Sequence, residues 1–143
     1  MKNINMNNID EVREAYKNVY NEFEAMCSWL QPELRKLSNV IEEEMDALTE
    51  KDYQEIVANN KDVSKEDIVT FEEYKDNMKS MHMHILSINS NLSVYKINYK
   101  HDEDYGDINL ALSLYFKMKF ALSYANKIYE DNKECLEEIK EIK

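Results

Sequence analysis

One stretch decides the fold: residues 108–139 read INLALSLYFKMKFALSYANKIYEDNKECLEEI. Its apolar side chains recur at alternating steps of three and four residues, and this heptad spacing lines them up on one face of a long helix. The face consists of Ile108, Ala111, Tyr115, Met118, Leu122, Ala125, Tyr129, Asn132, Leu136 and Ile139. Asn132 is its one clearly polar member, and a single buried Asn commonly sets register or oligomeric state in a coiled coil.

Two further stretches keep the same spacing. The first consists of Ile9, Val12, Tyr16, Val19, Phe23, Met26 and Leu30. The second consists of Phe71, Tyr74, Met78, Met81, Ile85, Ile88, Leu92, Tyr95 and Tyr99. Three such runs predict an all-α fold, an elongated antiparallel three- to four-helix bundle with coiled-coil-like heptad seams. Because residues 93–99 and 108–118 also suit strands, the alternative is an α+β fold with a β-hairpin around residues 93–116.

Capping signals divide the single domain into helices at about 8–30, 32–48, 50–59, 65–99 and 107–142. The signals at three of the starts are approximate capping boxes, formed by Asn8 with Glu11, Thr49 with Asp52 and Ser64 with Asp67. Gly106 and Asp107 can close a loop and cap the last helix. Pro32 suits the first turn of a new helix, and the alternative is a kinked continuation of the first one.

The composition excludes several classes of protein. The 143 residues include one Gly and one Pro, too few for glycine-rich phosphate loops or an all-β fold. A net charge of −11 without a basic stripe argues against direct nucleic-acid binding, and no stretch reads as a signal peptide or membrane span. Cys27 and Cys135 lack metal-site spacing, which predicts two reduced thiols in a cytoplasmic protein.

The negative charge is concentrated in residues 42–73, which carry 12 acidic and 3 basic side chains. Such a cluster attracts a basic surface over a long range, so we expect a protein partner with a basic surface. The expected contact residues are Glu42, Glu43, Glu44, Asp46, Glu50, Asp52 and Glu55. By analogy of size and charge, this suggests an inhibitor, an immunity protein or a nucleic-acid mimic of the kind that mobile elements or phages carry.

Residues 62–73, DVSKEDIVTFEE, suggest a different function. They have oxygen-bearing side chains at positions one, three, five, nine and twelve, and in this they resemble an EF-hand calcium loop. The resemblance implies a calcium- or metal-responsive helical protein with Asp62, Ser64, Glu66 and Glu73 as ligands. It departs from the family at position six, where Asp67 replaces Gly. The alternative is that Ser64 and Asp67 only cap the following helix.

No catalytic set is visible, so we expect a protein that is not an enzyme and needs no cofactor beyond the calcium just considered. The chain has no Glu-x-x-His motif, no serine in a strand-to-helix turn and no cysteine with an evident histidine partner. The run from Met81 to His84 resembles a metal motif, but the heptad phase puts Met81 in the seam with the two histidines pointing apart.

An uncharged stretch from Ser80 to Tyr95 predicts self-association. Together with the leucines and phenylalanines of residues 110–120, it widens the apolar surface beyond what three helices can cover. We therefore expect a homodimer whose interface includes Ile85, Ile88, Leu112 and Phe116. A purely structural coiled-coil oligomer is the remaining alternative function.

Overall fold

The computed structural model describes residues 4–60, 64–98 and 107–141, and within these ranges every regular element is helical. The elements are α1 (Ile9–Ala47), α2 (Glu50–Asn59), a short 3₁₀ turn (Lys65–Asp67), α3 (Phe71–Asn98) and α4 (Ile108–Glu141). The all-α bundle is confirmed. The hairpin alternative is wrong for the residues described, because residues 93–98 end α3 and residues 108–116 begin α4; residues 99–106 lie outside the described part.

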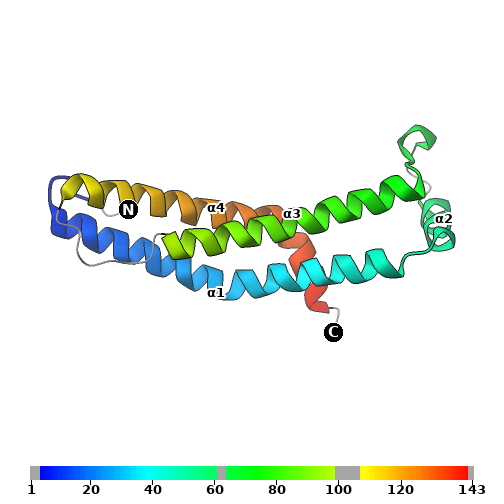
Figure 1. The fold of residues 1–143 in the computed structure, drawn as a ribbon, viewed down its shortest axis with the longest axis horizontal. Helices are drawn as coiled ribbons and strands as arrows, with labels where there is room; N and C mark the ends of the chain where they lie inside the picture. Colours follow the sequence, from blue (N-terminus) through cyan, green and yellow to red (C-terminus); the bar gives the residue numbers. More distant parts are fainter. Residues whose placement is uncertain (1–3, 61–63, 99–106, 142–143) are drawn as a thin grey trace.

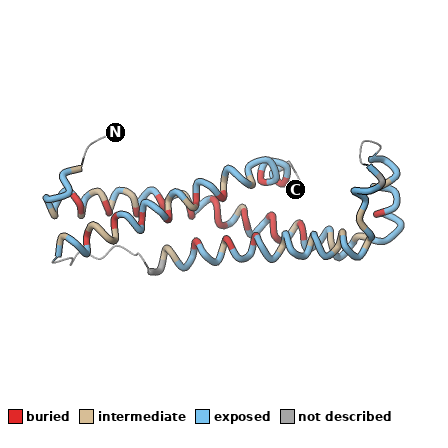
Figure 2. Tube along the Cα trace, turned by 90° about the horizontal axis from the view of Figure 1, so that it is seen from above, coloured by how far each residue is buried: buried red, intermediate tan, exposed pale blue. Residues whose placement is uncertain are grey.

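The three long helices run side by side along an elongated body, and α2 lies at one end, between the end of α1 and the start of α3 (Figure 1). Helix α1 packs along both α3 and α4, whereas α3 and α4 contact one another far less. The buried positions accordingly form stripes on the sides of the long helices that face each other (Figure 2). Helix α1 is therefore the centre of the core.

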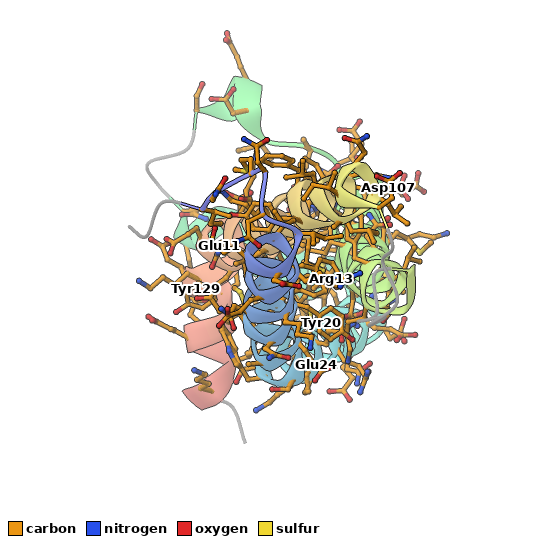
Figure 3. The ribbon with its side chains drawn as sticks, turned by 90° about the vertical axis from the view of Figure 1, so that its left-hand side faces the viewer. Glu11, Arg13, Tyr20, Glu24, Asp107 and Tyr129 are labelled. Carbon is orange, nitrogen blue, oxygen red and sulfur yellow. The ribbon has the colours of Figure 1, made fainter. Side chains whose placement is uncertain are left out.

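Helix α4 does not stay on one side of α1. Asp107, at its start, and Tyr129 lie on opposite sides of α1 in the end-on view (Figure 3). The crossing is held by an edge-to-face contact between the rings of Trp29 and Tyr129, whose centroids are 5.2 Å apart. Farther along, Lys140 Nζ lies 3.9 Å from Glu33 Oε1. The second half of α4 thus diverges from α3.

Helix α1 continues through Pro32, so the expected division into helices at 8–30 and 32–48 is wrong and the continuation alternative is correct. The proline is exposed, and apolar side chains on both sides of it are buried at steps of three and four residues. The buried apolar residues of α1 are Val12, Tyr16, Tyr20, Phe23, Cys27, Leu30, Leu34, Leu37 and Ile41. Because this stripe is unbroken, its burial outweighs the hydrogen bond that a proline removes.

The α3 seam differs from the expected one at Met81, which is 54% exposed. His82 instead faces α1, and the buried apolar positions that follow are Ile85, Ile88 and Leu92. The helical period of about 3.6 residues drifts away from a strict heptad, and here the drift moves the inward position by one residue. The α4 seam is largely as expected, with Ala121 and Ile128 added to it.

The helix starts follow most of the expected caps. Asn8 accepts hydrogen bonds from the backbone of Asp10 and Glu11, and Asp107 accepts one from Asn109. Helix α3, expected to begin near residue 65, begins at Phe71 because Thr70 Oγ1 accepts from the backbone N–H of Glu73 at 3.1 Å. Ser64 opens only the 3₁₀ turn, so the prediction that it caps the long helix is wrong.

Candidate functional site

The seven carboxylates expected to contact a partner are all exposed, and they lie at one end of the bundle. We call this group the acidic end; its members are Glu42, Glu43, Glu44, Asp46, Glu50, Asp52 and Glu55. Helix α1 ends at Ala47 and α2 begins at Glu50, so only a two-residue link separates the two helices that carry the group. Figure 1 shows α2 next to the end of α1, so the two helix segments that carry the group meet at this end of the bundle.

Thr49 and Asp52 form the turn that fixes this geometry. Thr49 Oγ1 accepts a hydrogen bond from the Asp52 backbone N–H at 3.1 Å, and Asp52 Oδ2 accepts one from the Thr49 backbone N–H at 3.2 Å. The expected capping box is therefore confirmed. Hydrogen bonding of the Asp52 carboxylate to the side chain and the backbone N–H of Thr49 holds the pKa of Asp52 below its usual range. Asp52 consequently keeps its negative charge to a lower pH than an aspartate without these hydrogen bonds.

A hollow of about 310 Å³ lies between α1, α2 and α3 at the acidic end. Its lining residues are Glu44, Ala47, Leu48, Asp52, Ile56, Tyr74 and Met78. Two carboxylates thus border a cavity whose other surfaces are apolar or aromatic. Such a site can accept the aliphatic stem of a long basic side chain while the carboxylates receive its charged head.

Tyr53 attaches α2 to the rest of the protein at this end. It is the buried residue of α2, and its ring centroid lies 4.9 Å from that of Tyr74 and 5.8 Å from that of Phe71. Its hydroxyl donates a hydrogen bond to the Val69 carbonyl. Because α2 buries so little else, this aromatic cluster determines where the carboxylates of α2 lie.

Ser38, His82 and Glu42 form a polar cluster between α1 and α3 that the sequence analysis missed. His82 Nδ1 lies 2.9 Å from Ser38 Oγ and 3.0 Å from the Ser38 carbonyl oxygen, and His82 Nε2 lies 4.0 Å from Glu42 Oε2. These are the residue types of a hydrolytic triad. Ser38, however, is 1% exposed in the middle of a helix, where a substrate cannot reach it and backbone N–H groups are already bonded. The cluster instead joins α1 to α3 beside Glu42.

Gln31 makes a second polar connection between the same helices. Its buried Nε2 donates to Ser93 Oγ at 2.7 Å and to the Asn89 carbonyl at 3.2 Å. Buried polar groups are costly unless they are paired, so these bonds specify the register of α1 against α3. In the sequence, each of the two connections is marked by a polar residue, Ser38 or Gln31, that falls on the otherwise apolar side of α1.

The calcium-loop residues are described only in part, because Asp62 lies outside the described residues. Ser64, Glu66 and Glu73 are exposed, and Ser64 Oγ accepts from the Glu66 backbone N–H at 3.4 Å. In the part of the chain that the structure describes, no group of three or more His, Cys, Asp or Glu residues is arranged to hold a metal ion. The calcium assignment stays a prediction.

The residues expected at an oligomer interface do not share one surface. Ile85 and Ile88 are buried in the core of this chain, because they face α1 and are not free to face a second copy. Leu112 is half-buried and Phe116 is exposed. Other exposed apolar side chains on the same two helices are Met81, Met83, Leu86, Val94, Leu110 and Phe120.

The two cysteines, which are free, differ in exposure and therefore in reactivity. Burial raises the pKa of Cys27 from 9.0 to about 11, against the opposing effect of Lys96, whereas Cys135 is exposed. Since the thiolate is the reactive form, we expect Ellman's reagent at pH 8 to modify Cys135 quickly and Cys27 only after unfolding in urea. A Cys135→Ser variant should lose the fast reaction, and fast labelling that persists in it would contradict the prediction.

The raised pKa of Cys27 also predicts the direction in which the stability of the protein changes with pH. The folded state keeps the Cys27 proton to higher pH than the unfolded chain does, so stability falls as the pH rises from about 9 through 11. Cys27→Ala should remove this part of the alkaline loss, measured by urea unfolding at several pH values.

Among the described residues, no helix combines the length and the apolar character needed to cross a membrane. The class that the fold defines is an all-α helical bundle. Comparison of the chain with protein-family models, with curated proteins and with solved structures finds no match.

Proposed function

We propose that this chain is a non-enzymatic protein-binding module whose acidic end docks on a basic surface of a partner protein. The observation that carries the proposal is a hollow at the end of the bundle that bears the seven exposed carboxylates; Glu44 and Asp52 line it, and its other lining residues are apolar or aromatic. A cluster of negative charge is also found at helix ends that contact only solvent. The hollow between Glu44 and Asp52 supports binding because it offers a specific contact as well as an attractive field.

Docking combines a long-range and a short-range interaction. The net charge of −9 on residues 42–73 steers a basic surface toward this end and raises the rate of encounter. On contact, a lysine or arginine of the partner lays its stem on Ile56 and Met78 and its charged group near Glu44 and Asp52. This arrangement suits an inhibitor, an immunity protein or a nucleic-acid mimic acting in the cytoplasm, because proteins that bind nucleic acids present basic surfaces.

The test begins with the partner, obtained by affinity purification from the native host and identified by mass spectrometry. We expect the triple variant Glu43→Gln, Glu44→Gln and Glu50→Gln to stay folded, since removing mutual repulsion does not weaken the core. Its association rate with the partner at low salt should fall roughly tenfold, and the dependence of that rate on ionic strength should flatten. Stopped-flow or biosensor kinetics measure both quantities.

A matched control separates this effect from a general change of net charge. Glu134, Glu137 and Glu138 are exposed on α4, so their replacement by Gln removes the same charge from another part of the surface. This control should leave the association rate nearly unchanged. The proposal fails if the two triple variants behave alike, or if the first leaves the kinetics at low salt unaltered.

A further inference from the structure

A second surface lies between α3 and α4, away from the acidic end. The two helices meet where the Tyr95 ring packs edge-on against Tyr124, with 5.6 Å between centroids, and where Asn91 Nδ2 donates to the Tyr124 hydroxyl at 3.0 Å. A groove of about 730 Å³ extends from this contact. We call it the α3–α4 groove; it is lined by His84, Ile88, Phe120, Ser123, Tyr124, Lys127, Ile128, Asp131 and Asn132.

Helix α4 crosses α1 (Figure 1), and α3 contacts α4 far less than it contacts α1. Met81 lies three residues before His84 and seven before Ile88, so the three share a stripe on α3, and the first of them is 54% exposed. On α4, Phe120 lines the groove and is 62% exposed. Apolar side chains of this size, spaced in this way on two diverging helices, form the kind of groove that accepts another helix.

The charges on α3 and α4 indicate which kind of chain binds in the α3–α4 groove. Residues 77–98 and 108–129, which form most of α3 and the first two-thirds of α4, carry five lysines and no carboxylate. The lysines are Lys79, Lys96, Lys117, Lys119 and Lys127. Lys127 lines the groove itself, and Asp131, one turn farther along α4, is the lining carboxylate. All 29 acidic residues of this acidic protein thus lie outside these two segments.

We propose that the α3–α4 groove binds an acidic amphipathic helix of a partner protein. The apolar face of that helix packs on Phe120 and Tyr124, with anchors at the i, i+3/i+4 and i+7 spacing, and its carboxylates face Lys127. A second copy docked through the same face would bring two lysine-bearing surfaces together, so charge favours a different, acidic chain. This inference does not depend on the acidic end, and the two surfaces together would let the protein join two partners of opposite charge.

Three synthetic peptides of about 20 residues test the proposal by fluorescence anisotropy with the full chain. The first is an amphipathic Leu/Ala/Glu helix, the second a scrambled peptide of the same composition, and the third the first peptide with Lys in place of Glu. We expect the first to bind at least tenfold more tightly than the others. Phe120→Ser should weaken its binding roughly tenfold, and Lys127→Glu should also weaken it.

Met83→Ser is the matched control for Phe120→Ser, because Met83 is 55% exposed, close to the 62% of Phe120, but does not line the groove. It should leave peptide binding unchanged, and circular dichroism should show every variant folded. Equal binding of the three peptides, indifference to Phe120→Ser, or no binding at about 1 mM peptide would overturn the proposal. Sedimentation equilibrium showing a dimer that Phe120→Ser dissociates would also overturn it, in favour of a second copy. None of these outcomes bears on docking at the acidic end, which the Gln variants test separately.

Discussion

Replacing Leu34 with alanine is expected to lower the free energy of unfolding by about 2 to 5 kcal/mol. Leu34 has no exposed surface, and it lies in α1, the described helix that packs along both α3 and α4. Truncation removes the free energy of burying the side chain and leaves a cavity at the centre of the bundle. Because both outer helices depend on α1 for their packing, unfolding should remain a single cooperative transition.

Urea denaturation followed by circular dichroism measures this loss. Leu86→Ala is the control, since it makes the same chemical change at an exposed position on α3. It should cost less than about 1 kcal/mol. If the two variants lose equal stability, the assignment of α1 as the centre of the core is incorrect.

The sequence predicts the helices well, because apolar periodicity and capping residues are local signals. It places α2 and α4 to within one residue at either end, and it identifies Asn8, Thr49 and Asp107 as caps. Its errors come from the heptad assumption. Over the 39 residues of α1 the true period lets Tyr20 and Cys27 replace Val19 and Met26 as the buried positions.

The sequence predicts one of the two candidate surfaces, the acidic end, but not the α3–α4 groove. The acidic end follows from charge counting, since carboxylates close in sequence on two adjoining helices stay close in space. The hollow beside it brings together Ala47, Ile56 and Tyr74 from three helices, and no local pattern reports such a meeting. The α3–α4 groove depends on where α4 crosses α1, and crossing angles arise from side-chain packing between helices rather than from the period within one.

Pro32→Ala should stabilise the protein by up to about 3 kcal/mol, the difference between these residues inside a helix. Proline has no N–H to donate to the Ser28 carbonyl, one turn earlier, and its ring crowds that carbonyl. Pro32 is exposed, so alanine restores the hydrogen bond without removing a core contact. Thermal and urea unfolding measure the gain, and Arg35→Ala, an exposed change in the following turn, should stay within about 0.5 kcal/mol of the parent.

Because of where Pro32 lies, the effect of Pro32→Ala on peptide binding is informative as well as its effect on stability. Trp29 and Glu33, its neighbours on α1, make the ring contact and the ion pair that hold α4 where it crosses. If proline only interrupts a hydrogen bond, Pro32→Ala gains stability and leaves peptide binding in the α3–α4 groove unchanged. If the shape that proline gives α1 directs the crossing, alanine lets α4 lie closer to α3, the groove narrows, and peptide affinity falls even though the helix itself is stronger. Measuring stability and peptide binding on the same variant therefore distinguishes a tolerated proline from one that creates a binding surface.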